Sequence, residues 1–156
     1  MTDRWLPDGF THPQRVELTD TTHLRPIRAS DVDIDMVTVM GNRDMLWRMY
    51  GEAWGWPPAT MTRAQDEEDL ARHAAEMVAH ESFNYAVLSD DETRLLGCVY
   101  IDPLEPTDAG EPAAEVSWWV GDEVDDDVRA ALDGFVPTWL EAAWPFARVT
   151  TPFQGR

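Results

Sequence analysis

The sequence predicts a mixed α/β (α+β) fold in which a mostly antiparallel central sheet is flanked by helices. Short apolar runs of extended character alternate with segments of helical periodicity from residue 16 onward. Only the final strand–helix–strand unit, residues 115–151, requires a parallel crossover. Eight Trp and seven Met side chains supply much of the apolar volume. We therefore expect a folded domain whose core depends on tryptophan.

The first fifty residues predict an arm, a hairpin and two short helices. Residues 1–15 contain two prolines and a glycine, and we expect an irregular arm that Trp5 and Phe10 hold in place. Two extended runs, residues 16–18 and 23–28, flank a polar turn and predict the hairpin. The expected helices follow, one capped at Ser30–Asp33 and running to Met40, the other covering residues 43–50. Residues 51–59 are expected to be irregular.

The middle of the chain predicts one long helix and three strands. Thr62 and Gln65 have the spacing of a capping box, so the helix should cover residues 62–81, with Asp66 in its acidic first turn. The strands are expected at residues 83–88, 95–101 and 115–120. The second is almost entirely apolar, which is typical of a central strand that is buried on both faces. Three prolines and a glycine predict a loop over residues 102–114.

The last part of the sequence predicts a long amphipathic helix and a short strand. Apolar residues recur with helical spacing from Val128 to Trp144. Pro137 should kink or restart this helix, and Pro145 should end it before a strand at residues 148–151. We expect residues 16–156 to form one domain, because the chain has about one domain's length.

Charge and composition exclude several classes of function. Thirty acidic residues against twelve arginines and no lysine give a formal charge of −18. Such a surface repels nucleic-acid phosphates and anionic lipids, and it attracts cations such as amines. No apolar run is long enough to span a membrane, and no signal peptide is visible, so a cytoplasmic protein is expected. The single cysteine, Cys98, cannot form a disulfide within the chain and is expected to be buried and inert.

Three segments in this order resemble the GNAT acetyltransferase family. HLRPIRASDVD (residues 23–33) is similar to that family's first strand and first helix, and residues 84–101, ending LLGCVYI, to its second and third strands. EVSWWVG (residues 115–121) is similar to the fourth strand, which leads into the cofactor loop. The resemblance implies a GNAT-like fold and the transfer of an acetyl group from acetyl-coenzyme A to an amine.

The chain departs from the family pattern in two places. The loop that should hold the pyrophosphate is represented by residues 125–130, where only Ala130 matches, Asp125 stands at the basic position and neither expected glycine is present. Arg129 is the remaining cation for that role. The sequence also stops after the expected fifth strand, before the segments that complete the acceptor pocket in the family. We therefore expect the missing part to come from a second subunit in a homodimer or from the N-terminal arm.

The resemblance assigns roles to the fourth strand and its neighbour. Glu115 is expected to be the general base, with a solvated strand-end glutamate as the alternative. The backbone of residues 118–120 (Trp118, Trp119, Val120) is expected to pair with the pantetheine chain, while the two Trp side chains pack on opposite faces. Tyr100 is a candidate general acid, although a strand tyrosine can be purely structural.

The tryptophan loop is the candidate amine site. Trp54 and Trp56 with nearby Glu52 suit recognition of a cation by ring faces and charge, and a lid or a partner-binding patch is the alternative. His73, Glu76 and His80 share a helical face but match no zinc-helix motif, so no metal is expected. Two functions remain open: N-acetyl transfer to a small amine, or a non-catalytic binding or dimerisation module of the same fold that no longer binds acetyl-coenzyme A.

Overall fold

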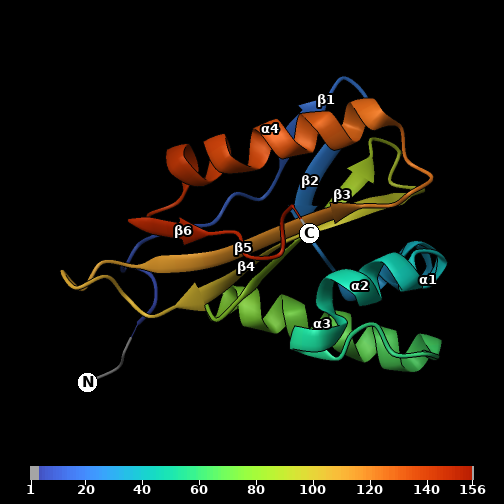
Figure 1. Cartoon of the computed structure of the whole chain (residues 1–156), viewed down its shortest axis with the longest axis horizontal. Coiled ribbons are helices and arrows are strands. Elements are labelled where there is room, and N and C mark those ends of the chain that lie inside the picture. Colours follow the sequence, from blue (N-terminus) through green and yellow to red (C-terminus); the bar gives the residue numbers. More distant parts are fainter. Residues whose placement is uncertain (1–3, 156) are drawn as a thin grey trace.

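The computed structural model describes residues 4–155, which form six strands and four α-helices (Figure 1). The strands are β1 (Val16–Thr19), β2 (Thr22–Pro26), β3 (Phe83–Ser89), β4 (Leu95–Leu104), β5 (Ala113–Val120) and β6 (Arg148–Thr150). The helices are α1 (Val32–Gly41), α2 (Arg43–Trp54), α3 (Arg63–Val78) and α4 (Asp126–Ala143), with a short 3-10 turn at Ala29–Asp31 before α1. None of these helices is long and apolar enough to cross a membrane.

The sheet confirms the predicted mixed, mostly antiparallel architecture. Its strands lie in the order β1-β2-β3-β4-β5-β6, and only the β5–β6 pair is parallel. Helix α4 makes the single crossover and covers one face, while α1, α2 and α3 gather on the other (Figure 1). The β1–β2 hairpin and the capping box of Thr62 and Gln65 are also as predicted.

Strands β4 and β5 are longer than the sequence predicted, because residues 102–104 and 113–114 pair instead of forming a loop. The prediction of a loop from residue 102 onward was wrong because it took Pro103 as the end of the strand. The pairing of β3 with β4 ends at Ile101, so β4 is an edge strand beyond that residue, where a proline is tolerated. The extension places Asp102 directly opposite Glu115 on the neighbouring strand.

Three helix boundaries also differ from the expectation. Helix α2 continues to Trp54, because Gly51 stays helical and only Gly55, with φ of +62°, ends it. Helix α3 stops at Val78, shortly before His80 with φ of +57°. Helix α4 runs through Pro137 as one element, since its buried stripe continues on both sides of the proline.

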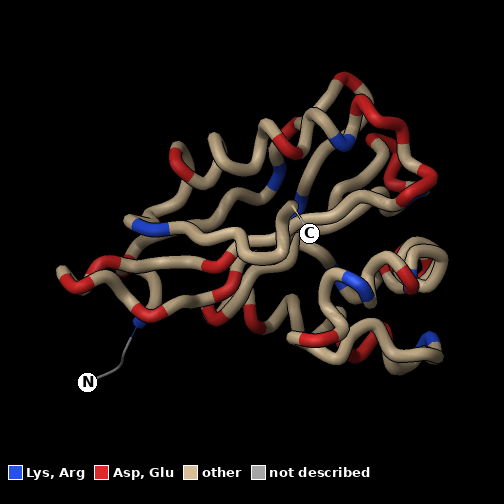
Figure 2. Tube along the Cα trace, viewed as in Figure 1, with Lys and Arg blue, Asp and Glu red and all other residues tan. Residues whose placement is uncertain are grey.

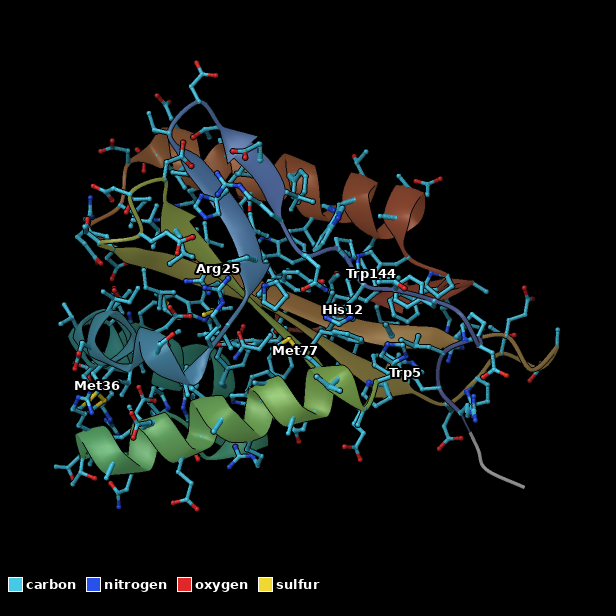
Figure 3. The ribbon with its side chains drawn as sticks, turned by 180° about the vertical axis from the view of Figure 1, so that it is seen from behind. Trp5, His12, Arg25, Met36, Met77 and Trp144 are labelled. Carbon is cyan, nitrogen blue, oxygen red and sulfur yellow. The ribbon has the colours of Figure 1, made fainter. Side chains whose placement is uncertain are left out.

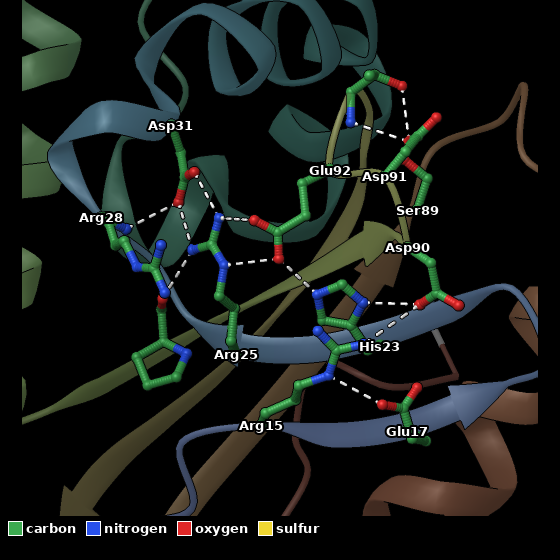
Figure 4. A network of polar contacts seen from close by, with 12 residues as sticks. Arg15, Glu17, His23, Arg25, Arg28, Asp31, Ser89, Asp90, Asp91 and Glu92 are labelled. Carbon is green, nitrogen blue, oxygen red and sulfur yellow. Dashed lines mark hydrogen bonds and ion pairs between the residues drawn. The ribbon is translucent and has the colours of Figure 1, made fainter.

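An ion network fixes the approach to α1 (Figure 4). The Arg25 guanidinium donates to both carboxylate oxygens of Asp31 at 2.9 and 2.8 Å, and to both of Glu92 at 3.1 and 3.0 Å. His23, fully buried, faces Glu92 at 2.6 Å and Asp90 at 2.8 Å. Asp31 was expected to help cap α1 but makes no side-chain cap bond, because Arg25 and the Arg28 amide occupy its oxygens.

The N-terminal arm is anchored by its aromatic residues. Trp5 donates from Nε1 to the carbonyl of Ala113 at 2.8 Å and packs against Phe83. Phe10 packs against Trp144, and both Trp144 and Trp5 stack on Phe146 (Figure 3 labels the two tryptophans). The arm therefore closes the same end of the sheet at which α4 ends.

Candidate active site

Strands β5 and β6 pair only over Ala113–Glu115 and then diverge. A cavity of about 490 Å³ opens next to this point, on the face of the sheet that α1, α2 and α3 cover. It lies between α1, α3, the end of α2 and strands β3 to β5. Its wall includes six carboxyl side chains: Asp35, Asp66, Asp69, Glu76, Asp102 and Glu115. Acidic residues also outnumber basic ones along the rest of the trace (Figure 2). The cavity therefore suits a cationic ligand.

Asp102 and Glu115 form one acidic group, at the sheet wall of the cavity. They are direct cross-strand neighbours, and Asp102 accepts a hydrogen bond from the Ser82 hydroxyl at 2.7 Å. Burial, together with the nearby charge of Glu115, raises the pKa of Asp102. Neither carboxylate forms an ion pair with any Arg or His among residues 4–155. The pair can therefore accept a proton from a bound ammonium group.

Asp35 and Asp66 form a second acidic group, where α1 and α3 line the cavity. Both side chains are at least 95% buried, and burial together with the contact to Asp66 raises the pKa of Asp35 well above its usual value. Oδ2 of Asp66 and Oδ1 of the neighbouring Asn84 are buried without a hydrogen-bond partner in the described structure. The raised pKa keeps a proton on Asp35 beside Asp66, while Asp66 and Asn84 each present one buried oxygen without a partner to the same cavity.

The other two acidic residues of the wall have partners on their own helix. Asp69 accepts from Arg72 at 2.9 Å, and Glu76 lies 3.3 Å from Nδ1 of His73. Burial lowers the pKa of His73. His80 instead packs against Phe10, so the three residues weighed as metal ligands do not converge. No group of three metal-ligating side chains occurs among the described residues.

Aromatic rings form the remaining wall. Trp54 stacks on Tyr50 with ring centroids 4.3 Å apart, and both Trp54 and Trp56 meet the edge of Tyr100. The Tyr100 hydroxyl accepts a hydrogen bond from Nε1 of Trp119 at 2.9 Å, and burial raises its pKa well above the usual value. Tyr100 therefore keeps its proton at neutral pH and is placed as a hydrogen-bonding wall residue.

A second hollow of about 290 Å³ lies along the free edge of β5, between α2 and α4. The Trp118 amide at this edge donates to Oε1 of Gln154 at 2.9 Å, so the chain's own C-terminal segment occupies the edge. Arg129 donates to the carbonyls of Val120 and Gly121 at 3.2 and 3.1 Å. No side chain caps α4 at Asp125, so the first N–H groups of the helix have no side-chain acceptor.

The structure brings most of the predicted site residues to these two hollows. Glu115, Tyr100, Trp54 and Trp56 line the cavity, while Trp118, Trp119, Val120 and Arg129 line the β5 edge. The Trp118 indole bonds Asp133 of α4 and the Trp119 indole bonds Tyr100, which confirms that they pack on opposite faces.

Two predicted residues lie outside both hollows. Glu52 is exposed because α2 extends through Trp54, and two residues along a helix turn a side chain about 200° away. Ala130 is exposed on α4, one residue beyond Arg129.

Sequence reasoning missed four residues of the cavity. Asp35 and Asp66 resembled ordinary acidic residues of first helical turns, and Asp102 was assigned to a loop. Asn84 carried no signal beyond a polar residue at the start of an apolar strand. Only Asn84 was detectable in principle, because a side-chain amide among apolar strand residues needs a hydrogen-bond partner once the strand is buried.

Comparison with known proteins places this geometry in a family. A family model described as an acetyltransferase (GNAT) domain matches residues 22–144. A search of curated proteins found no match.

Solved structures show the same fold at low sequence identity. Ribosomal-protein-S5-alanine acetyltransferase from Vibrio fischeri is 18% identical with a TM-score of 0.59, over 83% of this chain and 69% of that one. An acetyltransferase from Salmonella typhimurium that modifies the N-terminal serine of ribosomal protein L7/L12 is 12% identical with a TM-score of 0.65, over 87% and 73%. Microcin C7 self-immunity acetyltransferase MccE, solved with acetyl-CoA and AMP, is 11% identical with a TM-score of 0.59, over 85% and 70%.

Proposed function

This chain belongs to the GNAT acetyltransferase family, and from that premise we propose that it transfers an acetyl group from acetyl-coenzyme A to the amine of a small molecule bound in the acidic cavity. The observation that carries the proposal is the pair of carboxylates, Asp102 and Glu115, at the point where β5 and β6 separate. They have no basic partner in the described structure, and they face a cavity of the size of a small ligand.

The residues along the free edge of β5 fit the acetyl donor in part. Backbone groups of Trp118 and Val120 point to the open edge, as their bonds to Gln154 and Arg129 show, and can pair with the amides of a pantetheine chain. The uncapped start of α4 and Arg129 are the groups available to its phosphates, although residues 125–127 add three carboxylates there. Bound there, acetyl-coenzyme A supplies the acetyl thioester.

The cavity residues would then handle the acceptor and its proton. An amine enters protonated, so Asp102 and Glu115 first bind it as an ammonium group and then accept a proton from it. The free amine attacks the thioester carbonyl carbon, a C–N bond forms, the C–S bond breaks, and the leaving sulfur takes a proton. The raised pKa of Asp102 favours proton acceptance, so we assign the base function to the pair and keep Glu115 as the proposed general base. Tyr100 stays a proposed proton donor to the leaving thiolate.

Release of free coenzyme A thiol, measured with a panel of small amines, tests this function. Glu115→Gln should lower kcat/KM about 10²- to 10⁴-fold with an unchanged melting temperature, because it removes a general base. Glu111→Gln, which removes the same charge from an exposed loop position, should leave turnover unchanged. Equal turnover in both variants would overturn the assignment of Glu115. Tyr100→Phe tests the proton donor in the same assay.

Binding of the acetyl donor provides the second test. Acetyl-coenzyme A at a hundred times its Kd should stabilise the protein by about 2.7 kcal/mol in a thermal-shift titration, with adenosine diphosphate as a control. No shift at millimolar concentration would favour the alternative of a non-catalytic binding module, which the family and its solved neighbours do not favour. Peptides beginning with Ala or Ser, the residues that two neighbours modify, form a separate arm of the acceptor panel. The cytoplasmic location and the homodimer stay predictions, and a single-chain mass in light scattering would contradict the latter.

A further inference from the structure

The acidic cavity contains two separate acidic groups, and the proposed reaction uses only one of them. Asp102 and Glu115 belong to β4 and β5, whereas Asp35 and Asp66 belong to α1 and α3. Asp102 and Glu115 are direct cross-strand neighbours on the sheet, whereas Asp35 and Asp66 line the cavity from two helices. The cavity therefore has two acidic groups, one on the sheet and one on the helices, which we call its two poles.

The pole formed by Asp35, Asp66 and Asn84 contains two buried oxygen atoms that have no hydrogen-bond partner in the described structure. Oδ2 of Asp66 and Oδ1 of Asn84 are fully buried and accept no hydrogen bond in the described structure, and these side chains are 4% and 6% exposed. Asn84 is uncharged and lies on β3, so it is an observation independent of the two aspartates. Buried acceptors without partners are rare and costly in folded proteins, which points to a donor that arrives with a ligand.

The chemistry of these three side chains selects a cation that donates several hydrogen bonds. An ammonium group has three N–H donors and no acceptor, so it can satisfy Asp66 and Asn84 while compensating the charge of the aspartate pair. An anion would meet only like charge and lone pairs. A metal ion is disfavoured, since no suitable group of three ligating side chains exists among the described residues.

The rest of the wall suits the carbon chain of such a ligand. Leu70, Phe83 and the rings of Trp54, Trp56 and Tyr100 line the same cavity as the two poles. These side chains can cover methylene groups, and the Trp faces can also contact a cation. The cavity thus presents an acidic pole, an apolar wall and a second acidic pole.

We propose that the acceptor is a diamine-type compound with two cationic groups, one acetylated beside Asp102 and Glu115, the other held by Asp35, Asp66 and Asn84. This inference rests on the proposed function for the first amine, but the second pole is a binding site in its own right. The second ammonium group then sets the substrate class, because it selects diamines over monoamines and over amines that carry a carboxylate.

Calorimetric titration without acetyl-coenzyme A tests the second pole independently of catalysis. The ligands are diaminoalkanes of three to five carbons, the monoamine of matching length, and the amino alcohol in which a hydroxyl replaces the second amine. We expect the preferred diamine to bind at least about tenfold more tightly than its monoamine. Asp66→Asn should reduce this ratio to about threefold or less while leaving monoamine binding unchanged. Glu68→Gln, an exposed charge removal on the same helix, should keep the full ratio.

Each outcome has a defined meaning. Equal affinity for diamine and monoamine in the wild type would overturn the inference, as would a ratio that Glu68→Gln lowers as much as Asp66→Asn, since general charge attraction would then explain it. Asp35→Asn replaces Asp66→Asn if the latter does not fold. Preferential diamine binding without acetyl transfer would reject the proposed function but keep the site. Acetylation of monoamines and diamines with equal kcat/KM and equal affinity would keep the function and reject the second pole.

Discussion

The protein contains two clusters of carboxylates that differ in whether their buried negative charge has a cationic partner. In the Arg25 network, one guanidinium donates to both carboxylate oxygens of the buried Asp31 and to both of the half-exposed Glu92 (Figure 4). In the cavity, Asp35 and Asp66 are equally buried but contact each other and no arginine, and Oδ1 of Asn84 in the same cavity wall has no partner in the described structure. Asp35 follows Asp31 by only four positions along the chain.

The presence or absence of a cationic partner distinguishes carboxylates that stabilise the fold from carboxylates that we propose bind a ligand. A buried carboxylate with a bidentate arginine is compensated within the folded chain, so the folded state favours its charged form. A buried carboxylate beside another carboxylate makes the folded state less stable, so stability does not explain why the protein has this pair. The two clusters should therefore respond in opposite directions to mutation and to pH.

Arg25→Met should produce the largest effect on stability. It leaves the carboxylates of Asp31 and Glu92 without their cation, and we expect a loss of about 3 kcal/mol in the free energy of unfolding. Denaturant unfolding at pH 7 measures it. Arg63→Met is the matched control, because its ion pair with Asp33 is exposed to solvent and should contribute little to stability. Equal losses of unfolding free energy in the two variants would contradict a special stabilising role for the Arg25 network.

Glu92 should make the network sensitive to acid. The hydrogen bond from Arg25, aided by that with His23, lowers the pKa of Glu92 from 4.5 to about 2. Because the folded pKa is the lower one, its contribution is present above pH 4.5 and is lost as the pH falls toward 2. Glu92→Gln should therefore cost about 1–2 kcal/mol at pH 7, allowing for screening of this part-exposed side chain, and less as the pH falls. A cost that stays constant between pH 7 and 3 would contradict this.

Asp66→Asn should act in the opposite direction. Burial raises the pKa of Asp66 above its ordinary 3.8, so ionisation destabilises the folded state as the pH rises from that value. The variant should gain up to about 1 kcal/mol at pH 7, since it removes a buried carboxylate charge, and gain nothing at pH 3. Thermal or denaturant unfolding at both pH values measures the gain. Destabilisation at pH 7 would assign Asp66 to the stabilising kind of cluster.

Gln154→Ala should give the smallest change in free energy, and it extends the comparison to the β5 edge. There the Trp118 amide already has a partner from the chain itself, so an incoming donor molecule must replace it. Removing one such hydrogen bond, of about 1 kcal/mol, should raise affinity for acetyl-coenzyme A about fivefold. Calorimetry on this variant and on Gln14→Ala, an exposed residue of the arm, checks the prediction. Weaker binding in Gln154→Ala would show that Gln154 supports the site.

The elements of the fold were largely predictable because their signals are local. The apolar stripe of α4, the capping box of α3 and the all-apolar run of β4 each depend on residues a few positions apart. The errors arose where tertiary contacts outweighed local preference, as at Gly51 inside α2 and at Pro103 in the edge part of β4.

By itself, the sequence determined the order of strands and helices along the chain and the likeness to acetyltransferases, and it predicted an attraction for amines and a site near Glu115 and the tryptophan loop. Only the tertiary structure decided which carboxylates have partners. Asp31 and Asp35 look alike in sequence, and Asp102 looks like a loop residue, yet one meets Arg25, one meets Asp66 and one meets Glu115. Pairing and burial depend on residues far apart in the chain, 67 positions between Arg25 and Glu92 for example, so no local pattern can encode them.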